Sequence, residues 1–227
     1  MSTSATALNP PADSATGPTE HRTMNTIIHA AFRRDLRRLG EVLERFPADS
    51  RARADQITAA WSNISFQLHV HHQDEEHLFW PAFLELGVDP GLVAELESEH
   101  GQMVEALNGA ENAMATFSTN PSAINVAAAR AAVAELARVL HDHLTHEERD
   151  LEPFGAEHHD TRQHKAAVAK ARKSHTEGAG TFFAWLADTD DPAIAVGLRQ
   201  QVPRPVLFLL TRLGGRSYRR CSAAAWD

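Results

Sequence analysis

The sequence predicts an all-α protein: an up-down-up-down antiparallel four-helix bundle with an additional C-terminal helical extension. Apolar residues recur every three or four positions in four long segments, which is the period of an amphipathic helix. The loops between these segments are short and carry turn residues, so consecutive helices must run antiparallel. No segment after Ser50 alternates apolar and polar residues as a half-buried strand does.

The chain divides into three parts by composition. Residues 1–20 are rich in Ser, Thr, Ala and Pro without periodicity, so we expect a disordered N-terminal leader. Residues 21–155 hold the four helical segments, and 156–227 form an apolar helical extension that we expect to pack on the bundle. The turn signals between the four helices are at 47–50, 87–90 and 118–121.

Each predicted helix has one apolar seam that faces the middle of the bundle. The seams run from His29 to Phe46, from Ile57 to Leu78, from Leu96 to Phe117 and from Val126 to Glu147. Each seam carries a histidine, and two carry a glutamate four residues after it. These polar seam residues are His29, His71, Glu75, His100, His143 and Glu147.

The depths of these polar residues match. In an antiparallel bundle, the start of one helix lies beside the end of the next, so all six converge at one end. A buried carboxylate without a counter-charge costs several kcal/mol, and no Lys or Arg occupies the seams near these positions. His and Glu four apart share one helix face. The pattern therefore predicts bound metal cations.

Charge and cysteine content narrow the class of protein. The net charge of -8 without a basic stripe argues against nucleic acid and against an anionic membrane surface as partners. The cluster Arg212, Arg216, Arg219 and Arg220 is interpreted as a solvated tail. A single cysteine, Cys221, cannot form an internal disulfide, which favours a reducing cytoplasm. No apolar run is long enough to span a membrane, and no signal peptide is recognised.

Mixed imidazole and carboxylate ligands favour iron or manganese. Structural zinc prefers four ligands, often with Cys, and calcium prefers oxygen alone. Ferritin-like di-iron bundles use two Glu-x-x-His pairs, whereas this chain offers only Glu97-x-x-His100. The only tyrosine is Tyr218, outside the bundle, which argues against a tyrosyl-radical generator.

With these motifs in place, roughly residues 21–155 resemble the hemerythrin-like family, also called the HHE cation-binding domain. The resemblance is carried by His29, by 71–76 (HHQDEE) ending in Phe79-Trp80-Pro81, by Glu99-His100, and by 143–148 (HLTHEE) ending in Pro153. The residues after His29 and the segment from Pro203 to Tyr218 are similar to actinobacterial members in particular.

The resemblance implies two iron ions joined by two carboxylates and an oxygen-derived bridge. Carried over, Glu75 and Glu147 bridge, His29 and His71 bind one iron, and His100 and His143 bind the other. Animal hemerythrins have a further histidine four residues after the third-helix ligand, where this chain has Val104. His72 is expected to supply the missing ligand, with Glu97 as the weaker substitute. About one coordination position then stays open for a small ligand.

These expectations favour a non-haem di-iron protein that binds and reacts with O2, hydrogen peroxide or nitric oxide. Whether it is an enzyme stays open; catalase-like, peroxidase-like and nitric oxide-reactive activities all fit. The alternative is a non-enzymatic oxygen, iron or redox sensor, or an iron-binding protein, that signals through the extension to an unknown protein partner. The blandest alternative is a metal-free bundle with buried neutral histidines.

Overall fold

The computed structural model describes residues 22–47 and 49–226. Every regular element in these residues is helical, with no strand, which confirms the predicted all-α class. The predicted leader at 1–20 lies outside the described residues. None of the described helices combines the length and the apolar character that a bilayer crossing requires.

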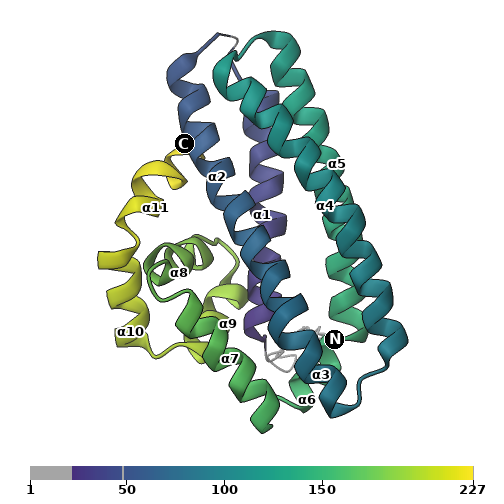
Figure 1. Cartoon of the computed structure of the whole chain (residues 1–227). Helices are drawn as coiled ribbons and strands as arrows, with labels where there is room; N and C mark the ends of the chain where they lie inside the picture. Colours follow the sequence, from purple (N-terminus) through teal and green to yellow (C-terminus); the bar gives the residue numbers. More distant parts are fainter. Residues whose placement is uncertain (1–21, 48, 227) are drawn as a thin grey trace, which may run out of the picture.

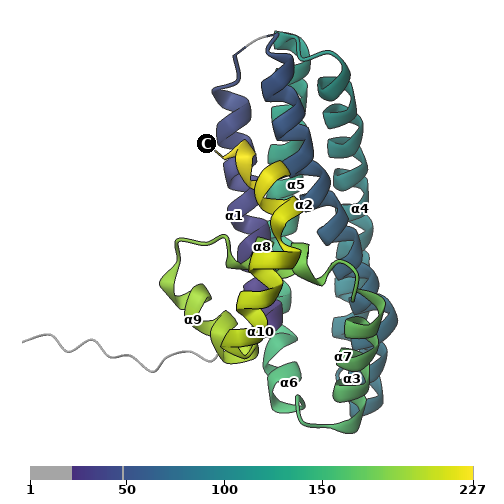
Figure 2. The ribbon, with the colours of Figure 1, turned by 90° about the vertical axis from the view of Figure 1, so that its left-hand side faces the viewer.

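Four long helices lie side by side (Figures 1 and 2): α1 (Met24–Glu44), α2 (Arg51–Asp74), α4 (Pro90–Thr119) and α5 (Ala123–Asp150). Their apolar seams meet in one core, in which Leu39, Ile57, Leu107 and Leu136 are fully or almost fully buried. Side-chain caps define two of the starts. Thr23 accepts a hydrogen bond from the Thr26 N–H, and Asp89 accepts one from the Gly91 N–H.

The second long helix contains a turn that the sequence pattern did not predict. A π-helical turn, η1 (Glu75–Phe79), joins α2 to α3 (Trp80–Leu86), and the Trp80 N–H donates to the Glu75 carbonyl five residues back. Pro81 follows directly and has no N–H for the usual bond to the carbonyl four residues back. The wider turn changes the hydrogen-bond register just before this proline. It begins at Glu75, one of the predicted ligands.

The residues after α5 form short helices. These are α6 (Glu152–Glu157), α7 (Arg162–Ser174), α8 (Ala179–Ala187), α9 (Pro192–Gln201), α10 (Arg204–Leu209), the π turn η2 (Leu210–Gly214), α11 (Arg216–Cys221) and η3 (Ala223–Ala225). In Figure 1, α7 to α11 lie beside α1 and α2, on the side away from α4. Trp185, Leu198 and Tyr218 from this part join the same core as α1.

A glycine-to-glycine contact joins α8 to η2. A Cβ atom built on Gly180 would overlap the backbone of Gly214, and one built on Gly215 would overlap the Ala184 side chain. The two segments therefore approach backbone to backbone, which only residues without a side chain permit.

Candidate metal centre

Seven buried polar side chains from the four long helices and η1 meet in the core. Their exposed fractions lie between 0% and 7%. Helix α1 contributes one, α2 two, η1 one, α4 one and α5 two. They are His29, His71, His72, Glu75, His100, His143 and Glu147, the seven predicted from the sequence.

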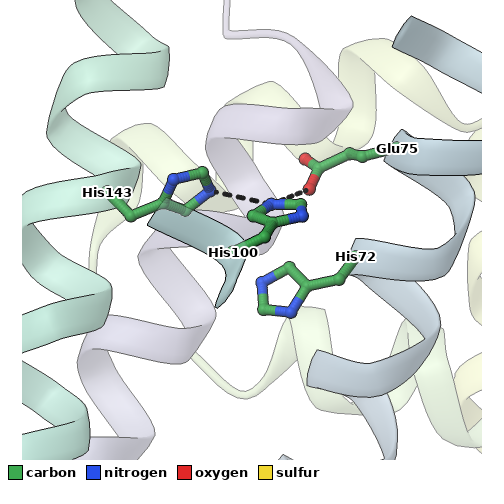
Figure 3. Close-up of side chains that lie close together, drawn as sticks. All are labelled: His72, Glu75, His100 and His143. Atoms are coloured by element: carbon green, nitrogen blue, oxygen red, sulfur yellow. Dashed lines mark hydrogen bonds and ion pairs between the residues drawn. The ribbon is translucent and has the colours of Figure 1, made fainter. Parts of the chain in front are cut away.

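The seven residues form two groups that share one member. In each group, one potential ligand atom per residue lies within 4.8 Å of all the others. The first, called the His72 group, is His72, Glu75, His100 and His143 (Figure 3). The second, called the His29 group, is His29, His71, Glu75 and Glu147. Glu75 belongs to both.

Helix geometry explains why Glu75 is shared. At about 100° per residue, a position four residues after His71 lies about 40° from it and about 60° from His72. Its carboxylate reaches both groups: Oε1 lies 3.1 Å from His71 Nε2, and Oε2 lies 3.4 Å from His100 Nε2. Glu147 Oε2 lies 3.3 Å from His29 Nε2.

The imidazole rings meet through their Nε2 atoms. His29 Nε2 lies 3.2 Å from His71 Nε2, and His100 Nε2 lies 3.2 Å from His143 Nε2. Two adjacent ligands on one octahedral ion, each about 2.1 Å from it, are about 3 Å apart. Both pairs therefore have the spacing that a shared ion requires.

Several of these buried atoms have no hydrogen-bond partner. They are both oxygens of Glu75, Oε2 of Glu147 and Nε2 of His72. Buried polar atoms are nearly always paired, and leaving one unpaired costs about 1–3 kcal/mol. All four atoms belong to residues of the two groups, in each of which one potential ligand atom per residue lies within 4.8 Å of the others. A cation in each group would satisfy them, so the donor set fits metal ions.

Burial shifts the pKa values of several of the seven residues. Burial, with help from the Glu147 carboxylate, raises the pKa of Glu75 well above its usual range. Burial also lowers the pKa of His71 and His72 well below theirs. Such shifts favour neutral imidazoles with free lone pairs, the state in which histidine binds a metal. A divalent ion would also stabilise the Glu75 carboxylate, which burial alone disfavours.

Three of the histidines are held from outside by carboxylates. A carboxylate accepts a hydrogen bond from each Nδ1–H, which leaves Nε2 of each ring facing the centre. The distances are 2.9 Å, 2.8 Å and 3.0 Å for His29 to Glu148, His100 to Glu76 and His143 to Glu99. Arg33 in turn donates to Glu148 at 2.6 Å. These contacts fix both the tautomer and the direction of each ring.

Aromatic side chains pack against the histidine rings. The Phe32 ring lies 5.5 Å from His71, and the Trp80 ring lies 4.4 Å from His100, centroid to centroid. Phe32 and Trp80 are themselves 0% and 3% exposed. The two groups therefore have apolar walls next to an imidazole of each.

The structure distinguishes the two residues that were considered as the additional ligand, His72 and Glu97. Glu97 is exposed and belongs to neither group, whereas His72 is buried inside one. Val104 is 45% exposed, so a ligand at that position would point away from the centre. The structure thus brings together the set with His72 and leaves Glu97 outside.

Sequence reasoning gave no role to two residues beside the centre. Asn25 donates from Nδ2 to Glu147 at 3.2 Å and to Glu152 at 3.0 Å, and Glu99 accepts from His143 and from His146. Asn25 lies four residues before His29, on the same helix face. That spacing is the sequence feature that could have indicated a position of Asn25 beside the centre.

The comparisons with known proteins gave one result. The family model described as the hemerythrin HHE cation-binding domain matches residues 26–155, more than half of the 227-residue chain. Searches of curated proteins and of solved structures each gave no match. With its imidazole and carboxylate groups inside the matched region, the chain belongs to the hemerythrin HHE cation-binding domain family.

Proposed function

We propose that the two groups hold two iron ions with a further oxygen-derived bridge between them. His29 and His71 would bind one ion, His72, His100 and His143 the other, and Glu75 and Glu147 would bridge. The observation that carries this proposal is the Glu75 carboxylate, whose two oxygens lie 3.1 Å and 3.4 Å from one imidazole of each group. Glu75 is 4% exposed and otherwise has no partner.

Iron is proposed from the number and kind of donors. Five imidazoles and two carboxylates are too many for a four-ligand zinc site, and calcium would not choose imidazole. With about six positions per ion, five nitrogens, four carboxylate oxygens and a shared bridge leave about one position open. That position would be in the His29 group, which has fewer imidazoles.

We infer that a small ligand, O2, hydrogen peroxide or nitric oxide, binds and reacts at this position. Bound iron would supply the electrons for that chemistry. The protein would orient the imidazoles and exclude water. Glu148, Glu76 and Glu99 hold three imidazoles by their Nδ1–H groups, and Phe32 covers His71 from the core. Whether turnover follows binding decides between an enzyme and a carrier.

The test is metal analysis of the purified full-length chain with a matched variant pair. We expect about two irons per chain and an oxo-bridge absorption band, both reduced in His100→Ala. His141→Ala is the control, because His141 is exposed on the same bundle and lies in neither group. Peroxide disproportionation or nitric oxide consumption by the iron-loaded protein, lost with His100→Ala, would identify the activity. A chain that stays metal-free after reconstitution with ferrous salt would refute the proposal.

One observation supports a second candidate, a sensor that signals through the extension. The Phe32 ring lies 5.5 Å from His71 and 5.1 Å from Trp185 of α8. If His71 moves when metal or ligand binds, the Phe32 ring would therefore transmit the movement to Trp185 in the extension. Protease sensitivity of residues 156–227 that depends on metal state, without any turnover, would favour this sensor.

We also propose the chain organisation and compartment expected from the sequence. The contiguous core of α1, α2, α4 and α5 supports an up-down-up-down bundle at 21–155. The contacts of Trp185 and Tyr218 with that core support an extension at 156–227 packed on it. The single cysteine, exposed Cys221, supports a reducing cytoplasm.

A further inference from the structure

The C-terminal helices carry an exposed apolar and basic face, here called the C-terminal patch. Four large apolar side chains, Val206, Phe208, Leu209 and Leu213, are exposed within a stretch of α10 and η2. The other exposed large apolar residues of the described chain are spread over several helices. The patch also contains Arg204, Arg212, Arg216 and Arg220, all exposed. In Figure 1, α10 and α11 lie at the outer edge of the molecule.

Helical spacing puts the two kinds of side chain together. Leu209 and Leu213 are four residues apart, as are Arg216 and Arg220, so each pair shares one face of its helical segment. The Arg212 guanidinium lies 5.9 Å from the centre of the Phe208 ring. The opposite face is inside, where the buried Gly215 lies against Ala184 and Tyr218 is buried. This outward face is therefore fixed by the packing of η2 and α11.

The arginines of the patch lack acidic partners. Several arginines elsewhere are paired with carboxylates, as Arg33, Arg37, Arg130 and Arg138 illustrate. Among the described residues, no ion pair involves Arg204, Arg212, Arg216 or Arg220. Arg219 is different, because it donates to the Thr211 and Arg212 carbonyls. Four guanidinium groups thus remain available for anions.

The sequence around the patch contains no acidic residue at all. No Asp or Glu occurs between Asp191 and Asp227, while the chain as a whole has a net charge of -8. Protein surfaces usually intersperse charges of both signs. The net charge of the whole chain argued against an anionic membrane as partner. That sum does not describe the C-terminal face, because the acidic residues lie elsewhere in the chain.

We propose that the C-terminal patch binds peripherally to an anionic lipid surface. Protruding Phe and Leu side chains would enter the boundary between headgroups and acyl chains, and the arginines would contact lipid phosphates, for which their planar fork is suited. A lipid surface is favoured over an acidic protein because an extended negative surface would contact the whole patch. Such a surface would repel any Asp or Glu within the patch, and the sequence from 192 to 226 contains none. The proposal does not depend on the metal centre.

The test is co-sedimentation of the full-length protein with vesicles of phosphatidylcholine, with and without phosphatidylglycerol. We expect binding only to vesicles that contain phosphatidylglycerol, and weaker binding at high salt. Arg216→Gln with Arg220→Gln should weaken this binding about 30-fold, from the contribution of two arginines near an anionic surface. Phe208→Ser should also weaken it.

Matched variants remove the same chemistry from other faces. Phe66→Ser changes a Phe that is 57% exposed, against 63% for Phe208. Arg130→Gln with Arg138→Gln removes two exposed arginines of the bundle. Both controls should bind vesicles as the unchanged chain does.

Three outcomes would overturn the proposal. They are no binding to phosphatidylglycerol vesicles at low salt, equal loss in the control variants, and a dimer dispersed by Phe208→Ser without vesicle binding. The last would assign the patch to a second copy of the chain. Helical circular dichroism of each variant checks that it is folded.

Discussion

The indole N–H of Trp185 donates a 2.8 Å hydrogen bond to Oδ2 of the buried Asp35 carboxylate. Asp35 Oδ1 accepts from Arg34 at 2.6 Å, and Arg34 also donates to the Trp185 carbonyl at 3.1 Å. Asp35 is 1% exposed and Trp185 is fully buried. The buried Asp35 charge is thus neutralised by Arg34, and its second oxygen is paired with Trp185 of the extension.

The first prediction concerns this contact. Asp35→Leu should destabilise the protein by about 3–5 kcal/mol, because it leaves the Arg34 guanidinium without its buried partner. Trp185→Phe should cost about 1–3 kcal/mol, because one Asp35 oxygen is left unpaired. Urea unfolding measures both. Arg37→Gln, which breaks an exposed pair with Glu41, should cost under about 1 kcal/mol. An equal loss of unfolding free energy in all three variants would show that the buried contact stabilises the protein no more than an exposed ion pair does.

The second prediction separates the two groups of the centre. Glu75 belongs to both groups, whereas His72 belongs to one. Glu75→Gln should therefore reduce bound iron in both, while His72→Ala should retain the ion of the His29 group, roughly half the metal of the unchanged chain. Iron content per chain measures the difference. The same loss in both variants would argue against a shared carboxylate.

The third prediction concerns a carboxylate that holds His143, one of the proposed metal ligands. Glu99 accepts the Nδ1–H of His143 at 3.0 Å. Glu99→Gln should lower metal affinity about 10–100-fold, because the ring loses an anionic partner that orients it. Glu95→Gln, an exposed change one turn earlier, is the control. Competition with a chelator measures affinity, and an unchanged value for Glu99→Gln would contradict the assigned role.

The fourth prediction tests how the extension is joined. Gly180→Ala places a methyl group on the Gly214 backbone, so we expect a loss of about 1–3 kcal/mol and faster proteolysis after α8. Gly101→Ala is the matched change, since nothing lies within 4 Å of a Cβ built there. It should be neutral or stabilise α4 by up to about 1 kcal/mol. Thermal unfolding with limited proteolysis distinguishes the two.

Much of the centre was predictable because helix periodicity is a local property. The spacing of His71 and Glu75, and of His143 and Glu147, puts each pair on one face whatever surrounds it. His72 was harder, since it lies outside the seam and its inward position depends on where α2 meets its neighbours. The π turn at Glu75 and the Gly180–Gly214 contact could not be predicted. A single helical period records neither a change of hydrogen-bond register nor the approach of two distant segments.

The last prediction is a pH dependence of metal binding. In the metal-free protein, burial opposes a charged His29, but the adjacent carboxylates of Glu147 and Glu148 outweigh it and raise the pKa of His29 from 6.5 to about 9. The stability from this protonated histidine is present below pH 6.5 and is lost as the pH rises through about 9. A metal ion must displace that proton, so its apparent affinity should rise over the same window.

Two measurements check this pH dependence. Iron or cobalt titrations between pH 6.5 and 9 should show tighter binding with increasing pH, accompanied by proton release. Glu148→Gln removes one of the two carboxylates that keep His29 protonated, so it should shift the dependence to lower pH. An affinity that is flat across this range would mean that His29 binds no proton in the metal-free protein.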